Sequence, residues 1–156
     1  MNNFKFIALD HLEFDYLNDL SERDLSKNNI IKMTVDKYPG FPCRITLEDA
    51  EIGEEVFLLN YNYHSAESPY RAGGPVFIRN NKTTRDYPVN VIPKMFLHRL
   101  LSLRAYDENG MMRSADVFEG NILDDKIDEA FNDNNIEYLH IHNAKPGCFN
   151  CVVVKV

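Results

Sequence analysis

Cysteine and histidine side chains that could carry covalent chemistry stand in two short motifs. Cys43 follows the turn-forming residues of PGFPCR, and His140 and His142 share the motif HIHN. A thiol attacks efficiently only when it is partly ionised, and a nearby histidine or arginine favours ionisation. We therefore consider Cys43 a candidate nucleophile, with His140 or His142 as the catalytic base and Cys148 as a second thiol. A buried cysteine is equally a common small core residue.

Arginines form a second candidate site, for an anion. Arg44, Arg71 and Arg104 each lie in or beside an expected turn or short strand, and Tyr70 precedes Arg71. Guanidinium groups bind carboxylates and phosphates through paired hydrogen bonds, so these side chains could form one pocket together with a histidine. The alternative is that each arginine pairs with an internal acid, for which Asp107 and Asp116 are available near Arg104.

A metal site is not expected, because the ligands are too few. Zinc sites use three or four protein ligands, whereas His-x-His supplies two. Cys43 or Cys148 could add a third, but nothing in the spacing requires it. The sequence therefore predicts neither a metal nor a cofactor.

Composition narrows the classes of protein. The 156 residues are 44% apolar, which suits a single domain over residues 1–156. The net charge of −7 argues against unaided binding to nucleic acid or to an anionic membrane. No apolar run approaches the roughly 20 residues of a membrane-spanning helix, and the first residues lack the features of a secretion signal, so we expect a cytoplasmic protein with free thiols.

Charge is unevenly distributed along the chain. Residues 105–137 hold ten acids and two bases, whereas six of the eight arginines lie within residues 39–104. The acids are explained by an expected amphipathic helix over 121–132, whose acidic first turn complements the helix dipole. The concentration of arginines in a neutral segment favours an anion site.

The pattern of elements predicts an α+β fold. Short strands that mostly return by hairpins alternate with three or four short helices, which favours an antiparallel or mixed sheet; a partly closed small barrel is the main alternative. Helices are expected over 14–26, with an N-terminal capping pair at Ser21 and Asp24, over 93–100 and over 121–132. Asn109 and Gly110 form the turn of one hairpin. Residues 64–74 form an ordered loop between two strands.

The last hairpin places the histidines on one face of a strand. Alternation puts Tyr138, His140 and His142 on one side and Leu139 and Ile141 on the other. If the loop NAKPG closes this hairpin with His142 opposite Cys148, then His140 lies opposite Asn150, and Cys148 joins the histidine face.

Four segments resemble a known family of bacterial proteins. PGFPCR, SPYRAGGPVFIR, LLSLRAYD with the following MM, and HIHNAKPGCF occur in the same order as in the family catalogued as domain of unknown function number 1203. The resemblance implies a bacterial source and a single-domain protein, and it transfers no activity. The family's motif positions would be Gly40, Phe41, Pro42, Cys43, Arg44, Ser68, Pro69, Tyr70, Arg71, Arg104, His140, His142, Asn143, Gly147, Cys148 and Phe149. Cys151 departs from the pattern.

Two functions from different classes remain open. In the first, the chain binds a carboxylate- or phosphate-bearing small molecule, with or without catalysis: Arg44, Tyr70, Arg71, Arg104, Asn143 and Cys148 would bind the ligand, and Cys43, His140 and His142 would be catalytic. In the second, the motifs only shape turns, and the protein is a structural or protein-interaction domain. A concave pocket favours the first, and arginines all paired with acids favour the second.

Overall fold

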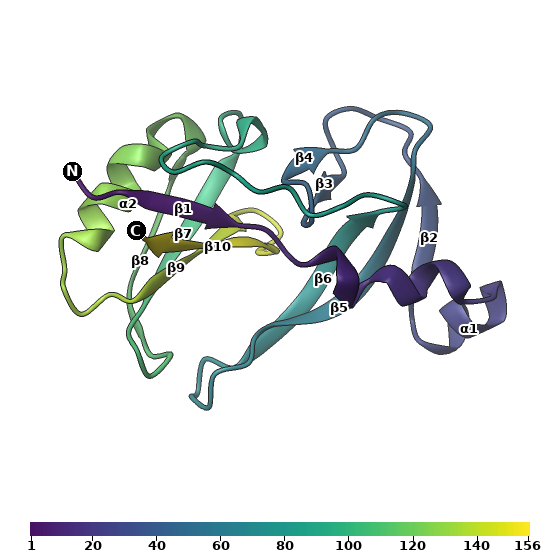
Figure 1. The fold of residues 1–156 in the computed structure, drawn as a ribbon, viewed down its shortest axis with the longest axis horizontal. Coiled ribbons are helices and arrows are strands. Elements are labelled where there is room, and N and C mark those ends of the chain that lie inside the picture. The colour runs from purple at the N-terminus through teal and green to yellow at the C-terminus, as the bar shows by residue number, and fades with distance from the viewer.

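A computed structural model describes all residues from Met1 to Val156 and contains two five-stranded sheets (Figure 1). The first, which we call the terminal sheet because it holds the first and last strands, is antiparallel throughout. Its strands follow the order β1 (Phe4–Ile7), β10 (Phe149–Lys155), β9 (Tyr138–Asn143), β7 (Leu100–Tyr106) and β8 (Met112–Glu119).

The second sheet, the central sheet, is mixed. It has the order β2 (Ile31–Thr34), β5 (Glu55–His64), β6 (Ala72–Arg79), β3 (Pro42–Cys43) and β4 (Glu48–Asp49), and only the pair β3–β6 is parallel. The expected α+β fold is therefore confirmed. Neither sheet closes into a barrel, so the barrel alternative is wrong.

Two α-helices, α1 (Glu22–Lys27) and α2 (Leu123–Phe131), lie at opposite ends of the molecule (Figure 1). Ser21 and Asp24 form the predicted capping box at α1. The other helical segments are the 3-10 turns η1 (His11–Glu13), η2 (Asp15–Asp19), η3 (Lys94–Phe96) and η4 (Gly120–Ile122). The helix expected over 93–100 is therefore only a single turn, because the chain enters β7 at Leu100.

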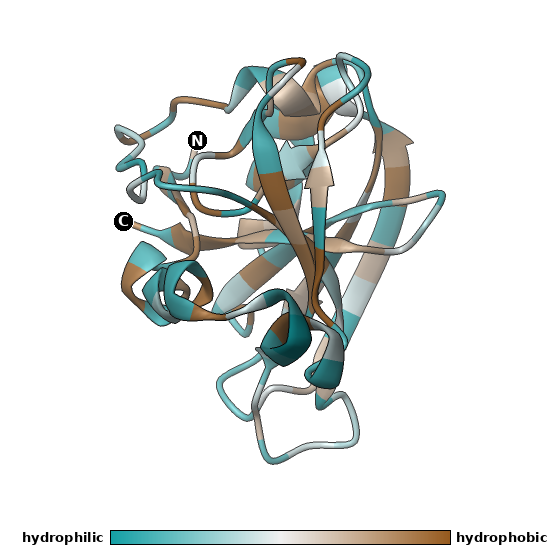
Figure 2. Cartoon of the chain, turned by 90° about the vertical axis from the view of Figure 1, so that its right-hand side faces the viewer, coloured by the Kyte–Doolittle hydropathy of each residue, from teal (hydrophilic) through white to brown (hydrophobic).

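The main core lies between the terminal sheet and α2. Leu139 and Ile141 of β9 pack there with Leu123, Ile127 and Phe131 of α2, all fully buried. The predicted alternation along β9 is therefore confirmed: Leu139 and Ile141 face this core, and the histidines lie on the opposite face of the strand. In Figure 2 the helical turns at the α1 end are mostly teal, in agreement with the single buried residue that each of η2 and α1 contributes.

The two sheets meet through the histidine face of β9. Tyr63 of β5 stacks on Phe149 of β10, with ring centroids 4.9 Å apart and planes 3° apart. His64 Nδ1 lies 2.8 Å from the Tyr70 carbonyl and therefore donates to it, so His64 Nε2 accepts from the Tyr138 hydroxyl at 2.6 Å. At the hairpin tips, Ser68 Oγ donates to the Gly110 carbonyl at 2.8 Å.

The predicted register of the last hairpin is wrong. His142 pairs with Phe149, His140 pairs with Val152, and the register shifts between Phe149 and Cys151. The extra residue at this bulge is Asn150, and Cys148 precedes the strand and belongs to the turn. A bulge of this kind leaves no signal in hydrophobic alternation.

Candidate functional site

A pocket of about 810 Å³ lies where the ends of both sheets meet. Three sequence motifs contribute to its wall: PGFPCR through Gly40, Pro42 and Arg44; the β9–β10 turn through Asn143, Lys145, Pro146 and Cys148; and the start of β7 through Arg99 and Leu100. Lys37, Pro39, Phe77, His98 and Glu119 complete the lining. The pocket thus assembles segments far apart in the sequence.

Arg44 is the buried cation of this pocket. Its side chain is 2% exposed, and Nε donates to the Phe149 carbonyl at 2.7 Å while Nη1 donates to the Pro42 carbonyl. No carboxylate lies within 4 Å of it, and Nη2 makes no hydrogen bond to the protein. Burial lowers the pKa of Arg44 to about 10, so the guanidinium stays charged at neutral pH. A buried charge of this kind needs a counter-ion or an array of acceptors.

Three hydrogen bonds hold the β9–β10 turn, which lines the pocket with Arg44. The amide of Gly147 donates to the Asn143 carbonyl and the amide of Asn143 to the Cys148 carbonyl, both at 2.9 Å. His142 Nδ1 lies 2.9 Å from the Gly147 carbonyl, which only accepts, so Nδ1 carries the proton. Gly147 adopts a φ of +80°, which suits glycine. His142 therefore positions the turn that presents Lys145 and Cys148.

Most of the uncompensated charge at the pocket is positive. Both carboxylate oxygens of Asp49 pair with Arg99, and His98 Nε2 lies 3.7 Å from the same carboxylate. Lys37 and Lys145 are exposed and form no ion pair. Glu119 is the one carboxylate in the lining and is also unpaired.

His140 and His142 do not reach this pocket. They are 1% and 0% exposed and are enclosed by the rings of Tyr63, Tyr106 and Phe149. Burial lowers the pKa of His140 to about 3 and that of His142 to about 4, and the charge of the nearby Arg104 lowers both. Both histidines are therefore neutral at pH 7. His140 Nδ1 and His142 Nε2 are buried without a hydrogen-bond partner.

Cys43 lies away from the pocket. Its thiol is fully buried in the core of the central sheet, where Sγ accepts from the Arg79 amide at 3.3 Å. Cys148 is half-buried and lines the pocket. The core interpretation of Cys43 thus fits the structure, and the arrangement gives no support to a nucleophilic role.

Tyr70 and Arg71 lie in the β5–β6 connection, and Arg104 lies on β7. Tyr70 packs edge-on to Tyr106 with centroids 6.4 Å apart, Arg71 is exposed, and Arg104 is half-buried opposite His140 on the neighbouring strand. None of the three lines the Arg44 pocket. The structure therefore brings only Arg44, Asn143 and Cys148 of the predicted ligand-binding residues into one pocket.

The acids suggested for Arg104 have other partners. Asp107 lies 3.8 Å from Arg113, and Asp116 lies 2.8 Å from Lys126. Arg104 consequently has no ion pair.

Five titratable residues of the lining were not predicted from the sequence: Lys37, His98, Arg99, Glu119 and Lys145. Lys145 could have been found, because it stands inside the NAKPG segment between Asn143 and Cys148. The others depend on the packing of one sheet against the other, which no local pattern encodes.

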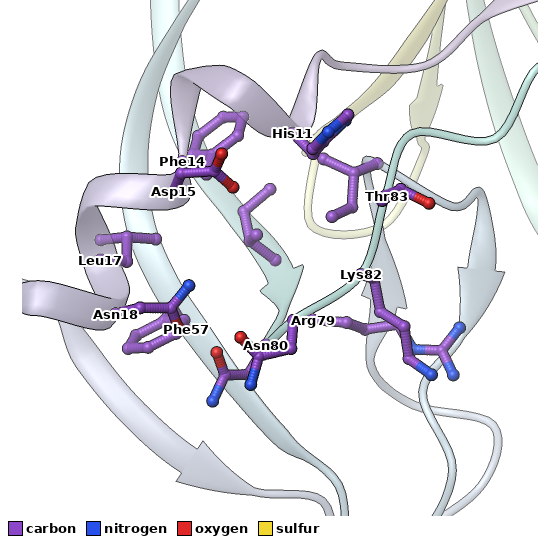
Figure 3. Close-up of a pocket in the computed structure, with 13 residues that line it drawn as sticks. His11, Phe14, Asp15, Leu17, Asn18, Phe57, Arg79, Asn80, Lys82 and Thr83 are labelled. Carbon is purple, nitrogen blue, oxygen red and sulfur yellow. The ribbon is translucent and has the colours of Figure 1, made fainter.

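A smaller cavity of about 350 Å³ lies between the η1–η2 segment and the end of β6 (Figure 3). Phe14, Leu17 and Phe57 supply apolar walls, and Asp15, Asn18, Asn80 and Lys82 lie around them (Figure 3). None of the predicted site residues lines it. No group of three or more His, Cys, Asp or Glu side chains in the molecule is arranged to hold a metal ion, and no helix could span a membrane.

Comparison with known proteins gives the same family as the sequence motifs. The model of the family described as "Protein of unknown function (DUF1203)" matches residues 40–155. No curated protein and no solved structure matches the chain. Since the matched region covers most of the 156 residues, from the Gly40 turn to the end of β10, the chain belongs to this family.

Proposed function

We propose that this protein binds an anionic small molecule, a carboxylate or a phosphate, in the Arg44 pocket. One observation carries the proposal: Arg44 is 2% exposed, lines a pocket of about 810 Å³, and has neither an acidic partner nor a hydrogen bond from Nη2. A bound anion would supply the missing partner. Lys37 and Lys145 at the same pocket strengthen the attraction.

The pairing of the other arginines supports this assignment. Arg79 pairs with Glu54 at 2.8 Å, Arg99 with Asp49 and Arg85 with Glu48, as expected for structural arginines. The three arginines predicted to bind an anion, Arg44, Arg71 and Arg104, have no such partner. Internal pairing therefore accounts for only part of the arginine-rich segment.

We assign binding rather than histidine or Cys43 catalysis to the site. His140, His142 and Cys43 are all buried outside the pocket, so roles in packing and in positioning the β9–β10 turn fit them better. A structural or protein-interaction role is the alternative function. A bacterial source, a cytoplasmic location, a single-domain organisation and the absence of nucleic-acid partners remain predictions from the sequence.

Nuclear magnetic resonance titration of the 15N-labelled protein with sodium phosphate and with sodium acetate tests the proposal. The expected result is a saturable shift of the amides of Arg44, Asn143 and Cys148 with at least one anion, while the α1 amides stay unchanged. The variant Arg44→Lys keeps the charge but loses the forked donor geometry and should weaken the effect. Shifts that are absent, or equally large throughout the surface, would refute a specific anion site.

A further inference from the structure

The charges around the Arg44 pocket indicate how much negative charge the bound anion carries. Asp49 neutralises Arg99, because its two carboxylate oxygens accept from both terminal nitrogens of that guanidinium. Three cations remain without an acid within 4 Å: Lys37, Arg44 and Lys145. The ligand that best complements them carries more than one negative charge.

These three cations come from three different segments. Lys37 lies in the connection from β2 to β3, Arg44 follows β3, and Lys145 lies in the β9–β10 turn. A single carboxylate offers two coplanar oxygens and one charge, so it would leave a cation unmatched. A phosphate monoester offers three terminal oxygens in a tetrahedral arrangement and about 1.5 to 2 negative charges at pH 7.

Building on the proposed anion-binding function, we infer that the pocket binds a soluble, hydroxyl-bearing phosphate monoester, with its phosphate among Lys37, Arg44 and Lys145 and a hydroxyl group at Glu119.

Glu119 and the uncharged lining residues indicate the rest of this ligand. An ionised carboxylate only accepts hydrogen bonds, so the exposed Glu119 in the lining can accept from a hydroxyl group of the ligand. Pro42, Phe77 and Leu100 add uncharged surface to the same lining. The volume of about 810 Å³ lies within the ordinary range of small-molecule pockets, roughly 300 to 1,000 Å³.

The pocket favours a soluble molecule over a lipid headgroup. A surface that inserts among lipids exposes apolar side chains around its binding site. Here the exposed side chains of the lining are mostly polar: Lys37, His98, Glu119 and Lys145. A lipid phosphate has the same headgroup chemistry, so it requires its own measurement.

Isothermal titration calorimetry with three soluble probes tests the ligand class. Glycerol 3-phosphate should bind most tightly, ethyl phosphate several-fold more weakly because it lacks hydroxyl groups, and succinate at least about tenfold more weakly because its two charges lie on separate planar carboxylates. Succinate binding as tight as that of glycerol 3-phosphate overturns the inference but leaves anion binding intact. Binding of none of these probes, together with no response to phosphate or acetate, rejects both proposals.

Vesicle sedimentation tests whether the bound phosphate belongs to a lipid headgroup instead of a soluble molecule. Phosphatidylcholine vesicles with and without phosphatidic acid should both leave the protein in the supernatant. Sedimentation with phosphatidic acid vesicles, without affinity for glycerol 3-phosphate, overturns the assignment to a soluble ligand.

Substitutions at the exposed charges keep the test independent of folding, because neither lysine makes a hydrogen bond. Lys37→Met and Lys145→Met should each weaken glycerol 3-phosphate binding about five- to tenfold, whereas Lys27→Met, which removes an exposed unpaired lysine on α1, should not. Glu119→Leu, which removes both acceptor oxygens, should abolish the preference for glycerol 3-phosphate over ethyl phosphate. Unchanged affinity in both pocket lysine variants contradicts the inference.

Discussion

The ring of Tyr63 in the central sheet stacks on the ring of Phe149 in the terminal sheet, with centroids 4.9 Å apart and planes nearly parallel. His140 packs edge-on against both rings, at centroid distances of 6.0 and 5.0 Å. The imidazole therefore fills the position of a third aromatic ring between the sheets. Its side chain makes no hydrogen bond, and Nδ1 is buried without a partner. Packing rather than polarity explains its contribution to the fold.

We predict that His140→Phe leaves the free energy of unfolding at pH 7.5 unchanged or raises it by up to about 1 kcal/mol. Phenylalanine retains the ring contacts and removes an unsatisfied buried nitrogen, the kind of replacement that is close to neutral or stabilising. Urea denaturation measures the change. A loss above about 2 kcal/mol would show that His140 Nδ1 has a partner that matters for stability.

The same substitution should reduce acid sensitivity. The pKa values of His140 and His142 are lowered from 6.5 to about 3 and about 4. Between the lowered pKa values and 6.5, the unfolded chain binds more protons than the folded chain. The contribution of the two neutral histidines to the free energy of unfolding is therefore complete above pH 6.5 and is lost as the pH falls. From pH 7.5 to 4.5 we expect the wild type to lose on the order of 2 to 5 kcal/mol. His140→Phe should lose about half as much through these two groups.

His142→Phe provides the contrasting prediction. This substitution removes the hydrogen bond from Nδ1 to the Gly147 carbonyl, 2.9 Å long, which anchors the β9–β10 turn. We expect a loss of about 1 to 2 kcal/mol in urea denaturation, and weaker phosphate binding because Lys145 and Cys148 lie in or beside this turn. An effect equal to that of His140→Phe would argue that the hydrogen bond does not position the turn.

Gly120 should tolerate no side chain. A Cβ at this position would lie 1.8 Å from the Phe96 carbonyl oxygen and 3.0 Å from that of Arg99, both backbone atoms. Gly120→Ala should therefore cost more than about 3 kcal/mol or prevent folding. Gly53→Ala is the matched control: Gly53 has a φ of +91° and open space around it, so only about 1 kcal/mol of backbone strain is expected. Thermal unfolding distinguishes the two, and equal melting temperatures would contradict this geometry.

Local signals in the sequence predicted the elements that depend on neighbouring residues. The capping box at Ser21 and Asp24, the β7–β8 turn at Gly110 and the alternation of His140 with Leu139 and Ile141 all follow from short-range chemistry. The α+β class follows from their succession. The bulge at Asn150 was not predicted, because one extra residue in a strand changes the register without changing composition.

The candidate site was predicted only in part for a related reason. Arg44, Asn143 and Cys148 do line one pocket, whereas Arg104 pairs with His140 in the terminal sheet and does not line it. Which motifs meet is decided by how one sheet packs on the other, and no motif encodes that packing by itself. That packing depends on side chains such as Tyr63 and Phe149, whose pairing spans much of the chain.

Cys148 offers a direct chemical readout of the pocket. Cys43 and Cys151 are fully buried, and burial also raises the pKa of the Cys151 thiol, whereas Cys148 is half-buried in the pocket wall. Iodoacetamide should therefore alkylate one thiol of the native protein rapidly and the other two only after unfolding, because alkylation needs an accessible thiolate. Mass spectrometry counts the modified residues, and Cys148→Ser should remove the rapid reaction.

Phosphate bound beside Arg44 should slow the alkylation of Cys148 several-fold in the wild type by covering Sγ, and sodium chloride at equal ionic strength should not. Rapid alkylation that phosphate leaves unchanged would contradict phosphate binding at Arg44, because Cys148 is a close neighbour of Arg44 in this lining.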